Sequence, residues 1–277
     1  MISLLLSLAQ YIKNVFVTDQ NVIEQNAYGP DTDKLLEYLS ENPINLNICM
    51  LHITSLPILP NSLKQFICYH TQITSLPTLP NSLESLYCNN TKITTLPALP
   101  NSLKYLDCDN TNITSLPTLP VNLRDLNCSN TQITSLPTLP NSLNSLSCYS
   151  TKITSLPTLP NNLYYLNCMN INITILPTLP NVLNRLYIIN TQIIELPRLP
   201  DSINHMWCTY NVIPSLLKQQ KIPREVFVYN KNNINIEQTA GEDNEAYLKR
   251  CYKLLLKENK LPKEIKLELI HKVIESM

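Results

Sequence analysis

Glycine is almost missing from this sequence of 277 residues, which contains only Gly29 and Gly241. A phosphate-binding loop or a dinucleotide-binding fingerprint needs several glycines close together, so that the backbone can approach the phosphate. The two glycines lie near opposite ends of the chain. The sequence therefore excludes both nucleotide-binding motifs.

An excess of charge is also missing, because 21 basic and 21 acidic residues give a formal net charge of zero. Domains that bind nucleic acid or anionic lipid usually carry a basic excess. We therefore expect no nucleic-acid partner and no membrane partner. The apolar opening Met1–Ala9 has no basic region and is shorter than a membrane-spanning helix. We interpret it as part of an amphipathic capping helix in preference to a signal peptide.

A twenty-residue repeat fills most of the chain. Seven consecutive units run from Asn61 to Pro200, and each follows the pattern NSLKYLDCDNTNITSLPTLP of residues 101–120. An imperfect unit ends at Pro60, and a decaying one follows Pro200 up to about Leu216. A short fixed period is typical of solenoids, in which one unit cannot bury its apolar face alone and stacks on its neighbours.

Each unit predicts one strand and one extended return. Tyr105–Asp109 alternates between outward and inward places, which is the period of a half-buried strand. The inward places of this unit hold Leu103, Leu106, Cys108, Thr111, Ile113, Leu116 and Leu119. The return has no helical period and carries Pro117 and Pro120, so we expect extended, polyproline-like backbone. Such a return requires no glycine turns.

The pattern LxxLxCxxTxI followed by LPxLP resembles the leucine-rich repeat, over roughly residues 44–216. It is similar to the short repeats of bacterial type III effectors and to the cysteine-bearing repeats of giant-virus proteins. The resemblance implies a repeat solenoid, a right-handed superhelix with a curved parallel sheet on its concave side, an extended convex side and helical caps. The family usually has asparagine where this chain has Thr71, Thr91, Thr111, Thr131 and Thr151. We expect these hydroxyls to bond backbone groups after each strand.

Seven of the nine cysteines occupy one inward place of the repeat, which Ile188 takes once. They are Cys68, Cys88, Cys108, Cys128, Cys148, Cys168 and Cys208. Neighbouring strands lie ~4.8 Å apart with parallel Cβ vectors, wider than the ~3.8 Å that a disulfide prefers. The total is odd, and no CxxC or zinc-finger spacing occurs. We therefore predict reduced core cysteines, no metal, no cofactor and a cytoplasmic location, in a host cell if the protein is viral.

No catalytic constellation stands out. His205 and Cys208 are close in sequence, but a separation of three residues on a strand places them on opposite faces. Some of the bacterial relatives carry a ubiquitin-ligase domain with a Cys-x-Asp nucleophile. After the repeats this chain has only Cys251, followed by Tyr252 and Lys253. We expect no enzyme and no small-molecule substrate.

The outward strand places are the candidate binding surface. The middle units form an acidic spot of Tyr105, Asp107, Asp109 and Asp125. The later units form an aromatic strip of Tyr149, Tyr165, Met169, Tyr187, Ile189 and Trp207. Aromatic residues and methionine are enriched in protein interfaces. Two interpretations stay open: the strip binds a partner, with Tyr187 and Trp207 as anchors, or its rings cover one another or are covered by residues 222–230.

The flanking segments predict caps, which solenoids need at both ends. Residues 1–43 predict a helical N-terminal cap, with a polar turn at Tyr28–Asp33 and a short helix at Lys34–Leu39. Residues 44–216 form the predicted solenoid, and residues 217–277 predict a mainly helical segment. Its helices are expected near Asp243–Glu258 and Pro262–Ser276.

The function predicted from the sequence is that of a non-enzymatic module that binds a protein through the concave face, a host protein if the chain is viral. One alternative rests on LPKEIKLELIHKVIESM from Leu261, which resembles the start of an F-box and would make the chain a ubiquitin-ligase substrate adaptor. The same segment also fits a plain amphipathic cap. A second alternative is a structural or self-associating scaffold, which the charge-poor repeats would suit.

Overall fold

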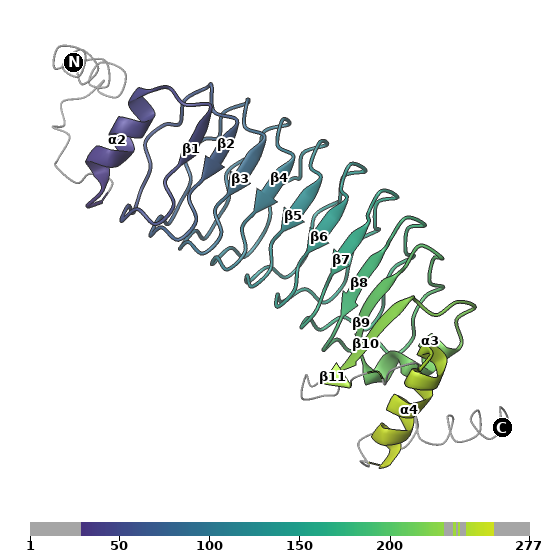
Figure 1. Ribbon diagram of the computed structural model, residues 1–277. Helices are drawn as coiled ribbons and strands as arrows, with labels where there is room; N and C mark the ends of the chain where they lie inside the picture. Colours follow the sequence, from purple (N-terminus) through teal and green to yellow (C-terminus); the bar gives the residue numbers. More distant parts are fainter. Residues whose placement is uncertain (1–28, 230–234, 237, 239–241, 258–277) are drawn as a thin grey trace, which may run out of the picture.

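The protein is a solenoid of stacked coils with one long curved sheet (Figure 1). The computed structural model describes residues 29–229, 235–236, 238 and 242–257. Ten strands pair in parallel in chain order, and an eleventh is added antiparallel at the end. The predicted parallel sheet of a leucine-rich repeat superhelix is confirmed.

The strands are short and repeat every twenty residues. They are β1 Asn45–Asn47, β2 Gln65–Ile67, β3 Ser85–Tyr87, β4 Tyr105–Asp107, β5 Asp125–Asn127, β6 Ser145–Ser147, β7 Tyr165–Asn167, β8 Arg185–Ile188, β9 His205–Thr209, β10 Glu225–Tyr229 and β11 Asn235–Ile236. Leu106 in β4 lies beside Leu86 in β3 and Leu126 in β5. Because the register equals the repeat length, identical places of successive units form continuous columns.

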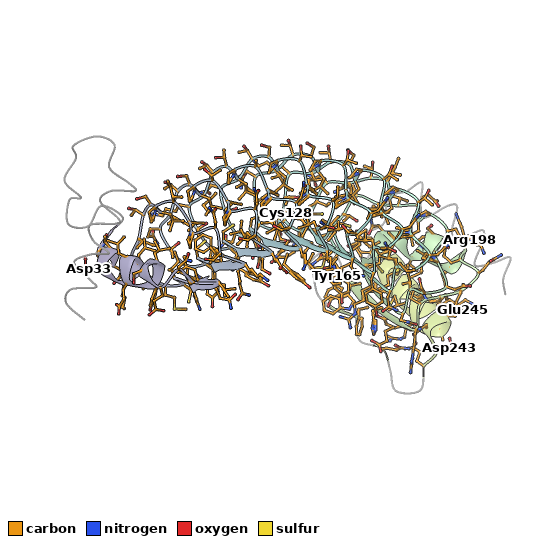
Figure 2. All side chains as sticks on the ribbon, turned by 90° about the horizontal axis from the view of Figure 1, so that it is seen from above. Asp33, Cys128, Tyr165, Arg198, Asp243 and Glu245 are labelled. Carbon is orange, nitrogen blue, oxygen red and sulfur yellow. The ribbon has the colours of Figure 1, made fainter. Side chains whose placement is uncertain are left out.

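The core lies between the sheet and the proline-rich return. Leu103, Leu106, Cys108 and Ile113 are all buried, and the same places are buried in the other regular coils. The seven cysteines of the column are completely buried, and no described cysteine forms a disulfide. Figure 2 shows Cys128 between the two walls of the solenoid. The prediction of inward-facing core cysteines is confirmed.

The threonine column forms the expected hydrogen bonds. The Thr111 hydroxyl donates to the carbonyl oxygen of Cys108 at 2.8 Å, and Thr71, Thr91, Thr131 and Thr151 repeat this bond at 2.7–2.8 Å. Each hydroxyl thereby satisfies a carbonyl just after the strand, where the sheet no longer pairs it. A bond of this kind contributes about 1 kcal/mol.

The tenth place of each unit has left-handed backbone. Asn90, Asn110, Asn130, Asn170 and Asn190 all have φ between 50° and 56°. Asparagine tolerates this region better than most residues because its short polar side chain bonds locally. The proline-rich return itself contains no such turn, but each regular coil needs one left-handed residue after its strand, and asparagine most often supplies it.

Helix α2, Thr32–Ser40, covers the N-terminal end of the core with Leu35 fully buried. The helix begins two residues earlier than the predicted Lys34. Gly29, at φ 118°, lies so close to this end that an added Cβ would come within 2.8 Å of the Cα of Ile53. The predicted helix at the start of the chain lies outside the described residues.

The C-terminal end of the core is covered by η1 Tyr210–Val212, α3 Ile213–Leu217 and α4 Asn244–Lys257. Tyr247, Leu248 and Cys251 of α4 are buried. The Val228 amide donates to the Tyr247 hydroxyl at 3.2 Å, which fastens α4 to the last long strand. Strand β10 extends the sheet past residue 216, where the sequence placed the end of the solenoid. The predicted helix at Pro262–Ser276 lies outside the described residues.

Candidate functional site

The concave surface is formed by the fifth and seventh places of the units, which flank the buried sixth residue of each short strand; in β7 the seventh residue, Asn167, is buried as well. In β4 these outward residues are Tyr105 and Asp107, on either side of buried Leu106. Tyr165 of β7 lies on the same concave side in Figure 2. The alternation predicted for these places is therefore confirmed.

A hollow of about 580 Å³ lies over strands β3 to β7. Tyr87 and Tyr105 line it on the N-terminal side, and Tyr149 and Tyr165 line it on the C-terminal side. Between them the columns hold only short polar side chains, such as those of Asn127, Ser145 and Ser147. The change from long to short side chains along the columns is what creates the hollow.

Asp107 and Asp125 of the predicted acidic spot line this hollow. Burial raises the pKa of Asp107, although its carboxylate accepts a hydrogen bond from the Asp109 amide at 3.1 Å. Burial also raises the pKa of Asp125, against a bond from Ser145 and the charge of Arg124. Both carboxylates are thus partly removed from water, and within the described chain neither forms an ion pair.

Asp109 is held beside the hollow by a small network. The Asn130 side chain donates to its carboxylate and to the Tyr149 hydroxyl, both at 2.9 Å. Tyr105, at 36% exposure, is the most accessible residue of the acidic spot. The structure therefore brings together Tyr105, Asp107 and Asp125 around one hollow and places Asp109 at its edge.

The rings of the aromatic strip contact one another from coil to coil. Ring centroids lie 5.3 Å apart between Tyr165 and Tyr187, and 5.0 Å apart between Tyr187 and Trp207. The ladder continues from Trp207 to Phe227 at 5.6 Å and to Tyr229 at 6.0 Å. Such pairs stabilise the stack by about 0.5–1.5 kcal/mol each beyond the area that they bury. Tyr187 and Trp207 still remain half-exposed.

Phe227 and Tyr229 were not among the predicted site residues. They lie on β10, which pairs in parallel with β9, so the segment, as far as residue 229, extends the ladder and does not fold over it. The signal was present in the spacing, because Val226, Phe227 and Val228 follow Met206, Trp207 and Cys208 by one repeat length.

Ile189 is a correction to the predicted surface. Its side chain is only 6% exposed, although it does not join the central core cluster, so it adds little accessible surface to the aromatic strip. Ser129, at the same place in an earlier unit, is also buried, so the outward alternation does not hold for the ninth place in every coil. Met169, at the same place one unit earlier, is half-buried.

Within the described ranges no three or more His, Cys, Asp or Glu side chains gather in a way that could hold a metal ion. In the same ranges no helix has the length and apolar character needed to cross a membrane.

The leucine-rich repeat appears in two kinds of comparison. The family model described as "Leucine Rich repeats (2 copies)" matches residues 61–101 and 81–121. YopM from Yersinia enterocolitica is 32% identical with a TM-score of 0.52, over 60% of this chain and 41% of YopM. The leucine-rich repeat domain of a Shigella effector is 24% identical with a TM-score of 0.59, over 84% of this chain and 99% of that domain. This chain thus spans less than half of YopM.

A more distant likeness, at 17% identity and a TM-score of 0.53, is to a chain of the octameric complex of latrophilin 3, Unc5D and FLRT2; it covers 68% of this chain and 69% of that one. No curated protein sequence matches the chain. Together the repeats, the sheet and the comparisons show a solenoid of the leucine-rich repeat type, in which residues 61–121 match the family model and the fold resembles that of bacterial effectors.

Proposed function

We propose that the chain is a non-enzymatic interaction module that binds a protein partner across its concave face. The observation that carries this proposal is the hollow over β3 to β7, continued by half-exposed aromatic rings at Tyr187 and Trp207. Half-buried aromatic rings that stay partly accessible beside a concave polar surface are typical of binding sites in which a few large side chains dominate the affinity.

The comparisons support the class of partner. A chain of an assembly of three proteins, one of which is named with its leucine-rich repeat domain, FLRT2, is similar in fold to this chain. A stacked solenoid also offers a long rigid surface, which suits the extended contacts that repeat proteins make. A cytoplasmic location is part of the proposal, because the seven column cysteines are buried and free, as in a reducing compartment.

A photo-crosslinking experiment tests the choice of face. A benzophenone amino acid is placed at Tyr165 on the concave side or, as the matched control, at exposed Thr154 on the preceding return. After illumination in a lysate of the native cell, a protein adduct is expected from position 165 and not from 154. Adducts from position 154 alone, or equal adducts from both, would contradict the proposal. Adducts at twice the chain mass of 31.6 kDa would favour the self-associating scaffold.

The anchor residues are tested with the same adduct. Combining Tyr187→Ala with Trp207→Ala should reduce its yield about tenfold or more, because each anchor is worth about 2 kcal/mol or more in a binding site. Tyr164→Ala is the control, since Tyr164 is an exposed tyrosine next to the strand and outside the ring ladder. Circular dichroism checks that the double variant is folded. An unchanged yield in a folded double variant would remove Tyr187 and Trp207 from the site.

A further inference from the structure

The hollow on the concave face has a one-sided electrostatic character. Every ionisable side chain that lines it is an aspartate or a tyrosine, and no lysine, arginine or histidine lines it. Two basic residues adjoin the lining without being part of it: Lys104, whose ammonium group lies 2.6 Å from the Glu84 carboxylate, and Arg124, which is next to Asp125. The charge of the whole chain is balanced, but the charge of this surface is not.

The two carboxylates of the hollow are stabilised only by neutral groups and by one neighbouring arginine outside the lining. Asp107 is bonded by the Asp109 amide and by the Asn127 side chain, and Asp109 adds an unfavourable negative charge nearby. Asp125 is bonded by Ser145, and Arg124 only partly offsets its burial. Carboxylates that are partly desolvated without an ion pair gain most from an added cation, because Coulomb attraction strengthens as water is excluded.

The tyrosines on both sides of the hollow suit the same kind of ligand. Tyr105 and Tyr165 present half-exposed rings on opposite sides of the short polar residues. Aromatic faces attract ammonium and guanidinium groups, and a guanidinium also stacks flat on a ring. Aromatic walls around carboxylates therefore favour a basic side chain, arginine above all, over an acidic or apolar one.

We propose that the hollow is the docking site for an arginine- or lysine-bearing segment of the partner protein, whose basic side chains enter between Tyr105 and Tyr165 and pair with Asp107 and Asp125. This inference rests on the proposed function and specifies the chemistry of its partner. Complementarity of charge across an interface raises both selectivity and the rate of association, and it weakens as salt is added.

Defined peptides test this inference without knowledge of the natural partner. The probe is a fluorescent decapeptide of alternating arginine and serine, since alternate residues of an extended chain point to one side. Its controls replace every arginine by uncharged citrulline or by glutamate. Fluorescence anisotropy should show binding of the arginine peptide, about tenfold or more weaker binding of the citrulline peptide and none of the glutamate peptide.

Matched variants of the protein separate the hollow from general charge attraction. Asp107→Asn and Asp125→Asn should each weaken binding of the arginine peptide about tenfold. Asp201→Asn removes the same charge from an exposed site at the start of its coil, away from the hollow, and should leave affinity unchanged within about twofold. Equal effects of the three variants, or equal binding of the arginine and citrulline peptides, would overturn the proposal.

Weaker peptide binding by Asp107→Asn is not expected to result from unfolding of the variant. Because the folded-state pKa of Asp107 is raised, its ionised carboxylate opposes folding once the pH exceeds that pKa. Asp107→Asn should therefore melt at the same or a higher temperature than the parent protein at pH 7. Crosslinks at position 165 without selective binding of the arginine peptide would contradict this inference and leave the proposed function unaffected. Absence of both the crosslink and the selective binding would contradict both proposals.

Discussion

Residues twenty positions apart in the sequence are neighbours in this solenoid, because each place of the unit recurs in the next coil. The tenth place is the clearest example, since asparagine, histidine, methionine and serine there all adopt positive φ. At Asn110 the side-chain amide also donates to Asn90 of the preceding coil at 2.6 Å. Asparagine thus supplies both the left-handed turn and a link between coils, which glycine could not.

A substitution at Ser150 tests the cost of this turn. Ser150 has φ 54°, and a β-branched side chain is strongly disfavoured in that region. Ser150→Val should lower the free energy of unfolding by about 1 kcal/mol. Ser155→Val, on the exposed return without positive φ, should change it by less than about 0.5 kcal/mol. Urea denaturation compares the two, and equal losses would contradict this account of the turn.

At the scale of elements, the N-terminal cap depends on one carboxylate. The Asp31 side chain precedes α2 and accepts a hydrogen bond from the His52 backbone amide at 2.6 Å. This bond, reinforced by the His52 ring at 3.2 Å, joins the helix to the first coil. The same bond lowers the pKa of Asp31 in the folded protein.

The stability of this cap should depend on pH in a defined direction. Because the folded-state pKa of Asp31 is lowered, its contribution is present above the ordinary aspartate value of about 3.9 and is lost as the pH falls through the folded value. Asp31→Asn should speed hydrogen exchange of the α2 amides at pH 6. Below the folded-state pKa of Asp31, where the carboxylate of the parent protein is protonated, the substitution should make no difference to the exchange rate. Glu37→Gln, in the exposed middle of α2, is the control. An effect of Asp31→Asn that persists unchanged at the lowest pH would contradict the role of the carboxylate.

At the scale of the whole molecule, stability is a sum over stacked coils. Each strand pairs only with the strands directly before and after it, from β1 to β11. The buried leucine, isoleucine and cysteine columns run through the regular coils, with Ile188 replacing cysteine once, so one coil closely resembles the next. Such a molecule should tolerate the loss of a complete coil but not of part of one.

Deletion of residues 121–140 tests this modular construction. It joins Pro120 to Asn141, which restores the normal junction between units and keeps every column in register. The variant should fold cooperatively, with a lower slope of unfolding free energy against urea because less surface is exposed. It should also bind the arginine peptide about tenfold or more weakly, since it lacks Asp125. Deletion of residues 121–130 alone should prevent folding, and a folded half-coil variant would contradict the register argument.

Local pattern was sufficient to predict much of this structure. The inward places, the cysteine column and the threonine bonds follow from alternation within one unit, because repeated units must stack in register to bury their apolar residues. The same reasoning was wrong at the ninth place of two units, where Ile189 and Ser129 are buried just beyond their strands. It also missed β10, since Phe227 keeps the twenty-residue spacing inside a segment that otherwise no longer resembles the repeat.

The sequence by itself therefore determined the solenoid, its core columns and the faces of most side chains, since these depend on order within a unit. Only the tertiary structure decided which outward residues form a site. The hollow exists because short side chains of β5 and β6 lie between tyrosines contributed by the neighbouring coils, and its two aspartates come from different strands. The ring ladder likewise depends on contacts between coils. Such properties arise from the relative size and charge of residues about twenty positions apart, which come together only when the coils stack.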